Sequence, residues 1–104
     1  MSNLNSTTWP AKYAQERITA EFDFARDIAP GDAVASVQMV VTTVLGVDAT
    51  PAALLYGAVQ LKGARAFQQL QGGVAGCSYR VEAQATTQNN NLLLLARVLP
   101  VVAL

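Results

Sequence analysis

Residues 72–87, with the sequence GGVAGCSYRVEAQATT, limit the possible folds of this chain more than any other stretch. The stretch begins with a glycine-rich corner, whose glycines allow backbone conformations that would strain a residue with a Cβ atom. From Ser78 onward, apolar or small residues alternate with polar residues, which is the period-two pattern of a half-buried β-strand. We expect the hydroxyl of Tyr79, just inside this strand, to bond back to the corner. The residues that we assign to this structural corner are Gly72, Gly73, Gly76 and Tyr79.

Other segments between turn sequences show a similar alternation or a β-branched composition. In the first of them, Ile18, Ala20 and Phe22 share one face, and charged or polar residues share the other. Residues 52–61 are ambiguous because their start could form a helix, and we assign a strand from about Leu55. The predicted strands cover residues 16–25, 34–45, 55–61, 64–71, 78–87 and 92–98. Together they indicate an all-β fold, an antiparallel β-sandwich of about six to seven strands.

We expect one domain at residues 13–99, preceded by an extended N-terminal arm at residues 1–12 and followed by an apolar C-terminal tail at residues 100–104. The arm is rich in serine, asparagine and threonine and shows no periodicity that would bury it in a core. It also contains Trp9 and Pro10, and a tryptophan is costly to leave in water. Two alternatives stay open for Trp9, which either folds back onto the domain or docks on a partner.

The last predicted strand is apolar on both faces, which makes its orientation the hardest to assign. We expect Leu93 and Leu95 to point outward, where covering each leucine would contribute about 1.5–3 kcal/mol. A partner could supply this cover, or the preceding loop or the C-terminal tail could do so. The residues that we assign to the core face are Leu92, Leu94, Ala96 and Val98.

The composition favours contacts between subunits. Charged residues make up 13% of the chain and hydrophobic residues 52%, which is more apolar material than we expect a domain of 104 residues to bury in its own core. We therefore expect several copies in a symmetric assembly, with a monomeric, weakly charged domain as the alternative. The formal net charge is zero, so neither nucleic acid nor a membrane surface is an expected partner.

The residues offer no recognisable catalytic, cofactor or metal site. The chain has no histidine and a single cysteine, which removes the commonest general base and the usual zinc clusters. Glu21 and Asp23 share a strand face, but a solvated face explains this spacing better than a catalytic carboxylate pair does. Asp27, Asp32 and Asp48 lie in predicted loops without the spacing of a calcium loop. We expect a protein that is not an enzyme and that holds no cofactor or metal.

Two blocks, ERITAEFDFARDIAPGDAV and LLYGAVQLKGARAFQQLQGGVAGCSYRVEAQATT, carry a family resemblance. They resemble the phage fiber-tail adaptor family, small tail or neck proteins of tailed bacteriophages. The resemblance covers about residues 12–99, and its strongest element is GGVAG followed by Tyr79. It implies an immunoglobulin-like or fibronectin-III-like sandwich. It also implies a non-enzymatic virion protein, present in several copies, that joins tail fibers to the tail or neck.

The same resemblance implies partners among other virion proteins, namely tail fiber, tail and neck proteins, and assembly in the cytoplasm of the bacterial host. With the apolar exterior, it leads us to expect contacts through the arm, the last strand and the tail. Two alternatives stay open: a capsid decoration or collar protein, and a carbohydrate-binding module or small hydrolase that uses loop acids such as Asp27. The expected interaction residues are Trp9, Pro10, Leu93, Leu95, Val101 and Leu104.

Overall fold

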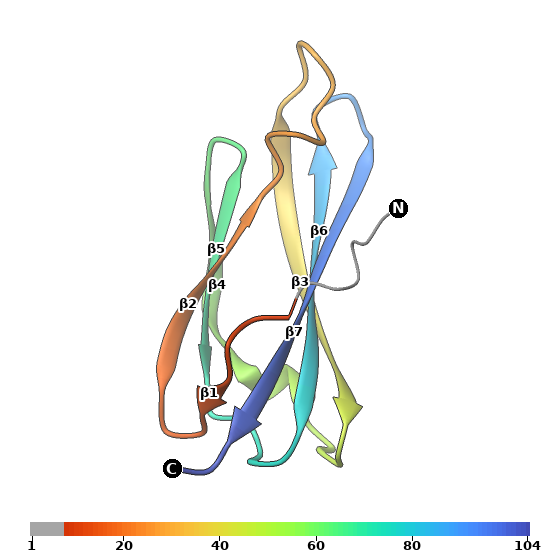
Figure 1. Ribbon diagram of the computed structural model, residues 1–104. Helices are drawn as coiled ribbons and strands as arrows, with labels where there is room; N and C mark the ends of the chain where they lie inside the picture. Colours follow the sequence, from red (N-terminus) through yellow and green to blue (C-terminus); the bar gives the residue numbers. More distant parts are fainter. Residues whose placement is uncertain (1–7) are drawn as a thin grey trace.

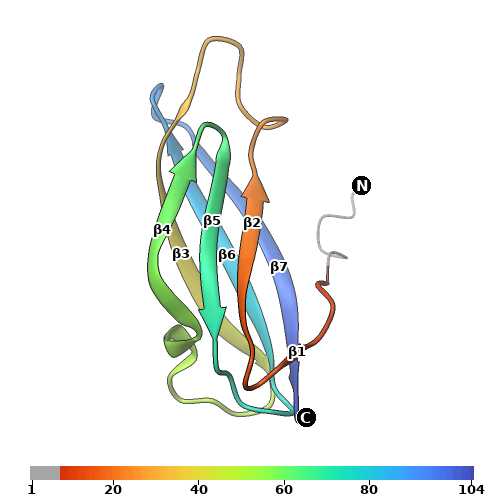
Figure 2. The same cartoon turned by 90° about the vertical axis from the view of Figure 1, so that its left-hand side faces the viewer.

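The computed structural model describes residues 8–104, which form two β-sheets packed against each other (Figures 1 and 2). The larger sheet has the strand order β1-β7-β6-β3, and the smaller has the order β2-β5-β4. The elements are β1 (Lys12–Tyr13), β2 (Arg17–Asp23), β3 (Val34–Leu45), the 3-10 helix η2 (Pro51–Leu54), β4 (Leu55–Lys62), β5 (Arg65–Gln71), β6 (Ser78–Thr87) and β7 (Leu92–Val102). The predicted all-β sandwich is confirmed, whereas its immunoglobulin-like or fibronectin-III-like subclass stays a prediction.

The ambiguous segment contains both a helical turn and a strand. Pro51 starts η2, a position where its fixed φ suits a helical turn, and β4 begins at Leu55 as predicted. The pairing of β4 with β5 is irregular between Tyr56 and Gln60, and Gly57 has a φ of 74° there. The buried amide of Gln68 donates hydrogen bonds to the carbonyls of Tyr56 and Gly57, at 3.2 and 3.1 Å. It thereby satisfies backbone groups that the bulge removes from the ladder.

The core lies between the sheets and is built from the inward faces of the alternating strands. Phe22 of β2 and Phe24 just after it are fully buried, as their alternation with charged neighbours predicted. Ala83 and Ala85 of β6 are also fully buried. Because these alanines are small, they leave volume beside them for larger side chains of the neighbouring strand.

The neighbouring strand β7 fills this volume with Leu93 and Leu95, so the predicted faces of β7 were wrong. In the antiparallel register of β6 and β7, Leu93 lies opposite Ala85, and Leu95 lies opposite Ala83. Directly opposite residues share a face of the sheet, so both leucines point inward and pack against the core. The residues that we had assigned to the core face, Leu92, Leu94, Ala96 and Val98, lie on the outer face instead.

The strand β7 also continues to Val102, beyond the end predicted at Val98, so only Ala103 and Leu104 follow it. Pro100 lies inside the strand without breaking its ladder with β6. The N–H of Val101 donates to the carbonyl of Cys77, so the backbone of Pro100 faces the opposite edge, toward β1. A proline is tolerated where its missing N–H faces away from the central pairing.

The described part of the arm lies along the C-terminal half of β7. Thr8 forms a bridge with Val98, the N–H of Trp9 donates to the Val98 carbonyl at 2.9 Å, and Lys12 pairs with Val101 in the parallel strand β1. Trp9 folds back onto the domain, with its ring centroid 5.5 Å from that of Phe22. Residues 1–7 of the predicted arm lie outside the described residues.

Candidate interaction surfaces

The glycine corner and its tyrosine hold one end of the sandwich together. Tyr79 is fully buried, and its hydroxyl accepts a hydrogen bond from the Val74 N–H at 2.8 Å while donating one to Oδ2 of Asp48 at 2.7 Å. Burial, aided by the carboxylate of Asp48, raises the pKa of Tyr79 to about 12. The hydrogen bond from Tyr79 in turn lowers the pKa of Asp48. The corner and the loop after β3 therefore form one connected unit.

Gly73 is the corner glycine that the packing requires. Its φ is +94°, and a Cβ atom there would lie 3.0 Å from Cγ2 of Val101 and 3.3 Å from Cδ1 of Leu54. Any other residue at this position would therefore adopt a strained left-handed backbone conformation, and its Cβ would crowd side chains of the core.

Lys12 is buried, with 1% of its surface exposed, and it fastens the arm to this corner. Its Nζ donates hydrogen bonds to the carbonyls of Gly72 at 2.7 Å and Tyr13 at 2.9 Å. Burial lowers the pKa of Lys12, and the nearby carboxylate of Glu16 partly opposes this shift. Lys12 is the last residue of the predicted extended arm, and no pattern in the sequence signals its burial.

Figure 1 shows that β3 and β7 finish at the same end of the sandwich. Several exposed apolar residues lie at this end. The two most exposed are Val47, at 88%, and Leu104, at 85%. We call this group the apolar end. Its members are Val44, Leu45, Val47, Val74, Val102 and Leu104.

A second apolar surface follows the outer face of β7. Leu92 and Leu94 are exposed at 63% and 55%, and every outward residue of this strand is apolar. We call this row the β7 stripe; it consists of Leu92, Leu94, Ala96, Val98, Pro100 and Val102. On the adjacent strand β6 the outward residues are polar or charged, so the stripe is confined to the edge of the sheet.

The edge of β7 is partly open beside this stripe. The described arm pairs with β7 only from Val98 onward, and it leaves the backbone of residues 92–96 without a strand on that side. An apolar edge strand with unpaired N–H and C=O groups is a template for association.

A groove of about 420 Å³ lies between the arm and β2. Its walls are mainly apolar, and Glu16 and Glu21 add carboxylates. The apolar lining residues include Trp9, Pro10, Ala11, Ile18 and Ala20.

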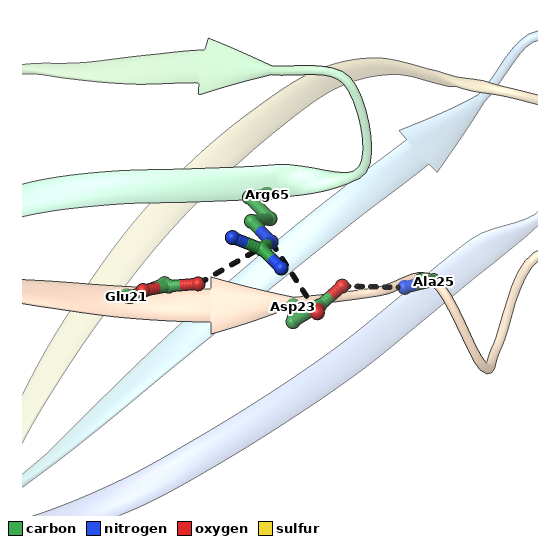
Figure 3. A network of polar contacts seen from close by, with 4 residues as sticks. All are labelled: Glu21, Asp23, Ala25 and Arg65. Atoms are coloured by element: carbon green, nitrogen blue, oxygen red, sulfur yellow. Dashed lines mark hydrogen bonds and ion pairs between the residues drawn. The ribbon is translucent and has the colours of Figure 1, made fainter.

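The carboxylates of Glu21 and Asp23 lie on either side of one guanidinium on the outer face of the smaller sheet (Figure 3). Nε of Arg65 is 3.5 Å from an oxygen of each, and Asp23 also accepts a hydrogen bond from the Ala25 N–H at 2.9 Å. All three charged side chains are exposed, so each ion pair adds about 0–1 kcal/mol to stability. This arrangement fits the solvated strand face that we preferred for the two acids.

Two of the loop acids, Asp32 and Asp48, serve turns at opposite ends of the sandwich. Asp32 accepts a hydrogen bond from the N–H of Asn89, in the hairpin between β6 and β7. Asp48 bonds Tyr79 at the other end. Across residues 8–104, no three acidic or cysteine side chains come close enough to hold a metal ion. No helix within that range has the length and apolar character needed to cross a bilayer.

The expected interaction residues divide between the interior and the surface. Leu93, Leu95 and Val101 face the core, with Val101 almost fully buried. The remaining three residues have accessible surface: Trp9 and Pro10 line the groove, and Leu104 belongs to the apolar end. The sequence did not identify Leu92 and Leu94 as outward residues. They belong to a run of four leucines, in which nothing distinguishes the outward positions from the inward ones.

One comparison with known proteins identifies a family. A family model described as Gp77, podophage GP4 fiber-tail adaptor protein gp77, matches residues 12–96. The matched range starts at β1 and ends within β7, so it includes strands of both sheets. No curated protein matches the chain.

Proposed function

The chain belongs to the podophage fiber-tail adaptor family, and on this premise we propose that it joins fibers to the tail or neck of the virion through direct protein contacts. It acts as a structural component and catalyses no reaction. It is present in several copies arranged symmetrically, which assemble in the cytoplasm of the bacterial host. Its partners are tail fiber, tail and neck proteins, and further copies of itself.

The observation that carries this proposal is the β7 stripe, because it joins exposed apolar side chains to an open strand edge. Leu92 and Leu94 stand in solvent beside backbone groups that have no partner strand among residues 8–104. Burying each of these side chains would contribute up to about 1.5–3 kcal/mol. A protein that carries such an edge requires something to cover it.

The apolar end supplies a second surface with a different position and direction. It lies at the tip where β3 and β7 end, whereas the β7 stripe runs along the side of the sandwich, and the two surfaces meet at Val102. Figure 1 shows this tip and the course of β7. Two contact surfaces that face different directions suit an adaptor, which has to hold two neighbours at once. We assign the β7 stripe to contacts between copies and the apolar end to a tail or neck protein.

Cross-linking mass spectrometry on purified virions tests this function. We expect cross-links from this chain to both a fiber protein and a tail or neck protein, and cross-links between copies of the chain. Cross-links to the major capsid protein alone would overturn the proposal and favour a capsid decoration or collar role.

A further inference from the structure

The strand β2 lies at the edge of the smaller sheet and has one open side. It pairs with β5 and with no other strand in the described part of the chain. The N–H of Phe24 donates to the carbonyl of Ala64 at 2.9 Å, in line with the register of this pair. Backbone groups alternate in direction along an antiparallel strand, so Ala20 also faces β5, whereas Thr19 and Glu21 turn their N–H and C=O groups to the open side.

The groove described above lies beside this open side. Thr19 and Glu21 line it together with Ile18, and residues of the arm line it as well. Figure 2 shows the arm running beside the edge strand β2. Its volume of about 420 Å³ lies within the range of pockets that hold ligands in proteins. The site therefore combines free backbone donors and acceptors with a mainly apolar wall that carries Trp9.

Two carboxylates and one lysine are the charged side chains that line the groove. The carboxylates belong to Glu16 and Glu21, and Asp23 lies next along the outer face of β2. Arg17 also lies on the outer face of β2, but its guanidinium points away from the open side, to Gln71 of β5 and the ring of Tyr56. Arg65 contacts both Glu21 and Asp23, so one guanidinium serves two carboxylates. The lysine in the lining, Lys12, is buried and directs its Nζ to backbone carbonyls, so it does not offset the acids at the surface.

We propose that this groove binds an extended segment of another virion protein, in which apolar residues alternate with lysine or arginine. The segment pairs with β2 as an added strand. Its apolar side chains point toward Ile18 and Trp9, and its basic side chains lie across from Glu21 and Asp23 on the outer face. This inference rests on the proposed function, because it names the chemistry of one partner contact of the adaptor.

A synthetic peptide, KVKVKVK with a fluorescent label, provides the probe, and EVEVEVE is its control. We expect fluorescence anisotropy to show binding of the basic peptide at least about tenfold tighter than that of the acidic one, a difference of about 1.4 kcal/mol. Glu21→Gln should weaken the binding of the basic peptide several-fold. The substitution removes one of the negative charges that attract the lysines, while the positive charge of Arg65 stays beside the site.

Substitutions at Thr19 test the added strand itself. Thr19→Pro removes an N–H from the open side without removing a bond to β5, and we expect it to weaken peptide binding about tenfold or more. Thr19→Val keeps the N–H and is the matched control, for which we expect little change. Circular dichroism establishes that both variants are folded.

Amide hydrogen exchange by NMR gives a readout that does not depend on the variants. We expect the amides of Thr19 and Glu21 to exchange fast in the free protein and slowly with KVKVKVK bound, while Ala20 exchanges slowly in both states. Equal binding of both peptides, no effect of Thr19→Pro, or unprotected amides in the complex would each overturn the inference. Protection of Thr19 and Glu21 that grows with protein concentration alone would also overturn it, because a second copy would then occupy the edge.

The two proposals fail in different ways. If the peptide does not bind but virion cross-links still reach fiber and tail proteins, the groove inference is wrong and the proposed function stands. If those cross-links are absent, the proposed function fails whatever the peptide does, and the groove inference, which rests on it, fails as well.

Discussion

Two double variants at alternate positions of β7 separate the stability of this domain from its assembly. Leu93 and Leu95 are partly buried against the core, whereas Leu92 and Leu94 are exposed on the outer face. Leu93→Asp with Leu95→Asp should therefore unfold the domain or weaken it severely. Leu92→Asp with Leu94→Asp should leave it folded and prevent association between copies.

The expected size of each effect follows from burial. Two half-buried leucines contribute about 1.5–3 kcal/mol together. Each unpaired carboxylate on the core side costs about 1–3 kcal/mol more. The inward pair should thus lose about 3.5–9 kcal/mol, which is comparable to the whole stability of a domain, about 5–15 kcal/mol. The outward pair should change the free energy of unfolding by no more than about 1 kcal/mol.

Urea denaturation followed by circular dichroism measures the first effect, and native mass spectrometry measures the second. Gln84→Asp is the matched control, since Gln84 lies opposite Leu94 on the outer face and its replacement adds a charge without removing an apolar side chain. A folded inward variant and an unfolded outward variant would show that the register of β7 is wrong. An outward variant that is folded and still assembles would show that the β7 stripe is not an interface.

Three further changes test the corner and the arm. Tyr79→Phe removes a hydroxyl bonded on both sides and should cost about 1–3 kcal/mol in urea denaturation. The pKa of Asp48 is lowered from 3.8 in the folded state, in part by its hydrogen bond with Tyr79. This bond therefore stabilises the fold above pH 3.8 and loses its effect as the pH falls through the lowered pKa. Tyr79→Phe should accordingly make the free energy of unfolding less dependent on pH in this acid range. Gly73→Ala should lower the melting temperature more than Gly63→Ala, because both have positive φ but only the first adds a Cβ within 3.0 Å of a core side chain. Lys12→Ala should cost about 1–3 kcal/mol and speed amide exchange in the arm, since it leaves buried carbonyls without a donor; unchanged exchange would contradict this role.

Alternation made most of the sandwich predictable from the sequence. In β2, the buried residues Ala20 and Phe22 stand between charged or polar neighbours, so the two faces differ and the pattern assigns them. The same logic holds for β6, where Tyr79 and Val81 are buried between polar residues. The strand β4 was predictable from Gly57 and the alternation of Val59 and Leu61, although the start of its segment also suited a helix.

The errors fall where local sequence carries no such contrast. Four consecutive leucines make both faces of β7 equally apolar, so only the register with β6 decides that Leu93 and Leu95 point inward. The burial of Lys12 depends on the carbonyl of Gly72, which lies sixty residues away in the chain. Contacts between residues that lie far apart in the chain decide both outcomes, and the pattern of a single sequence does not show such contacts.

The two ends of the sandwich differ in chemistry, and this gives the subunit a direction. One tip carries the asparagine hairpin held by Asp32, and the other carries the exposed valines and leucines of the apolar end around Val47. A subunit whose two ends differ in this way binds different neighbours at each end. In a ring whose members all set their apolar tips against the same neighbouring protein, every member points the same way, so the chemical difference between the two tips becomes a polarity along the ring axis.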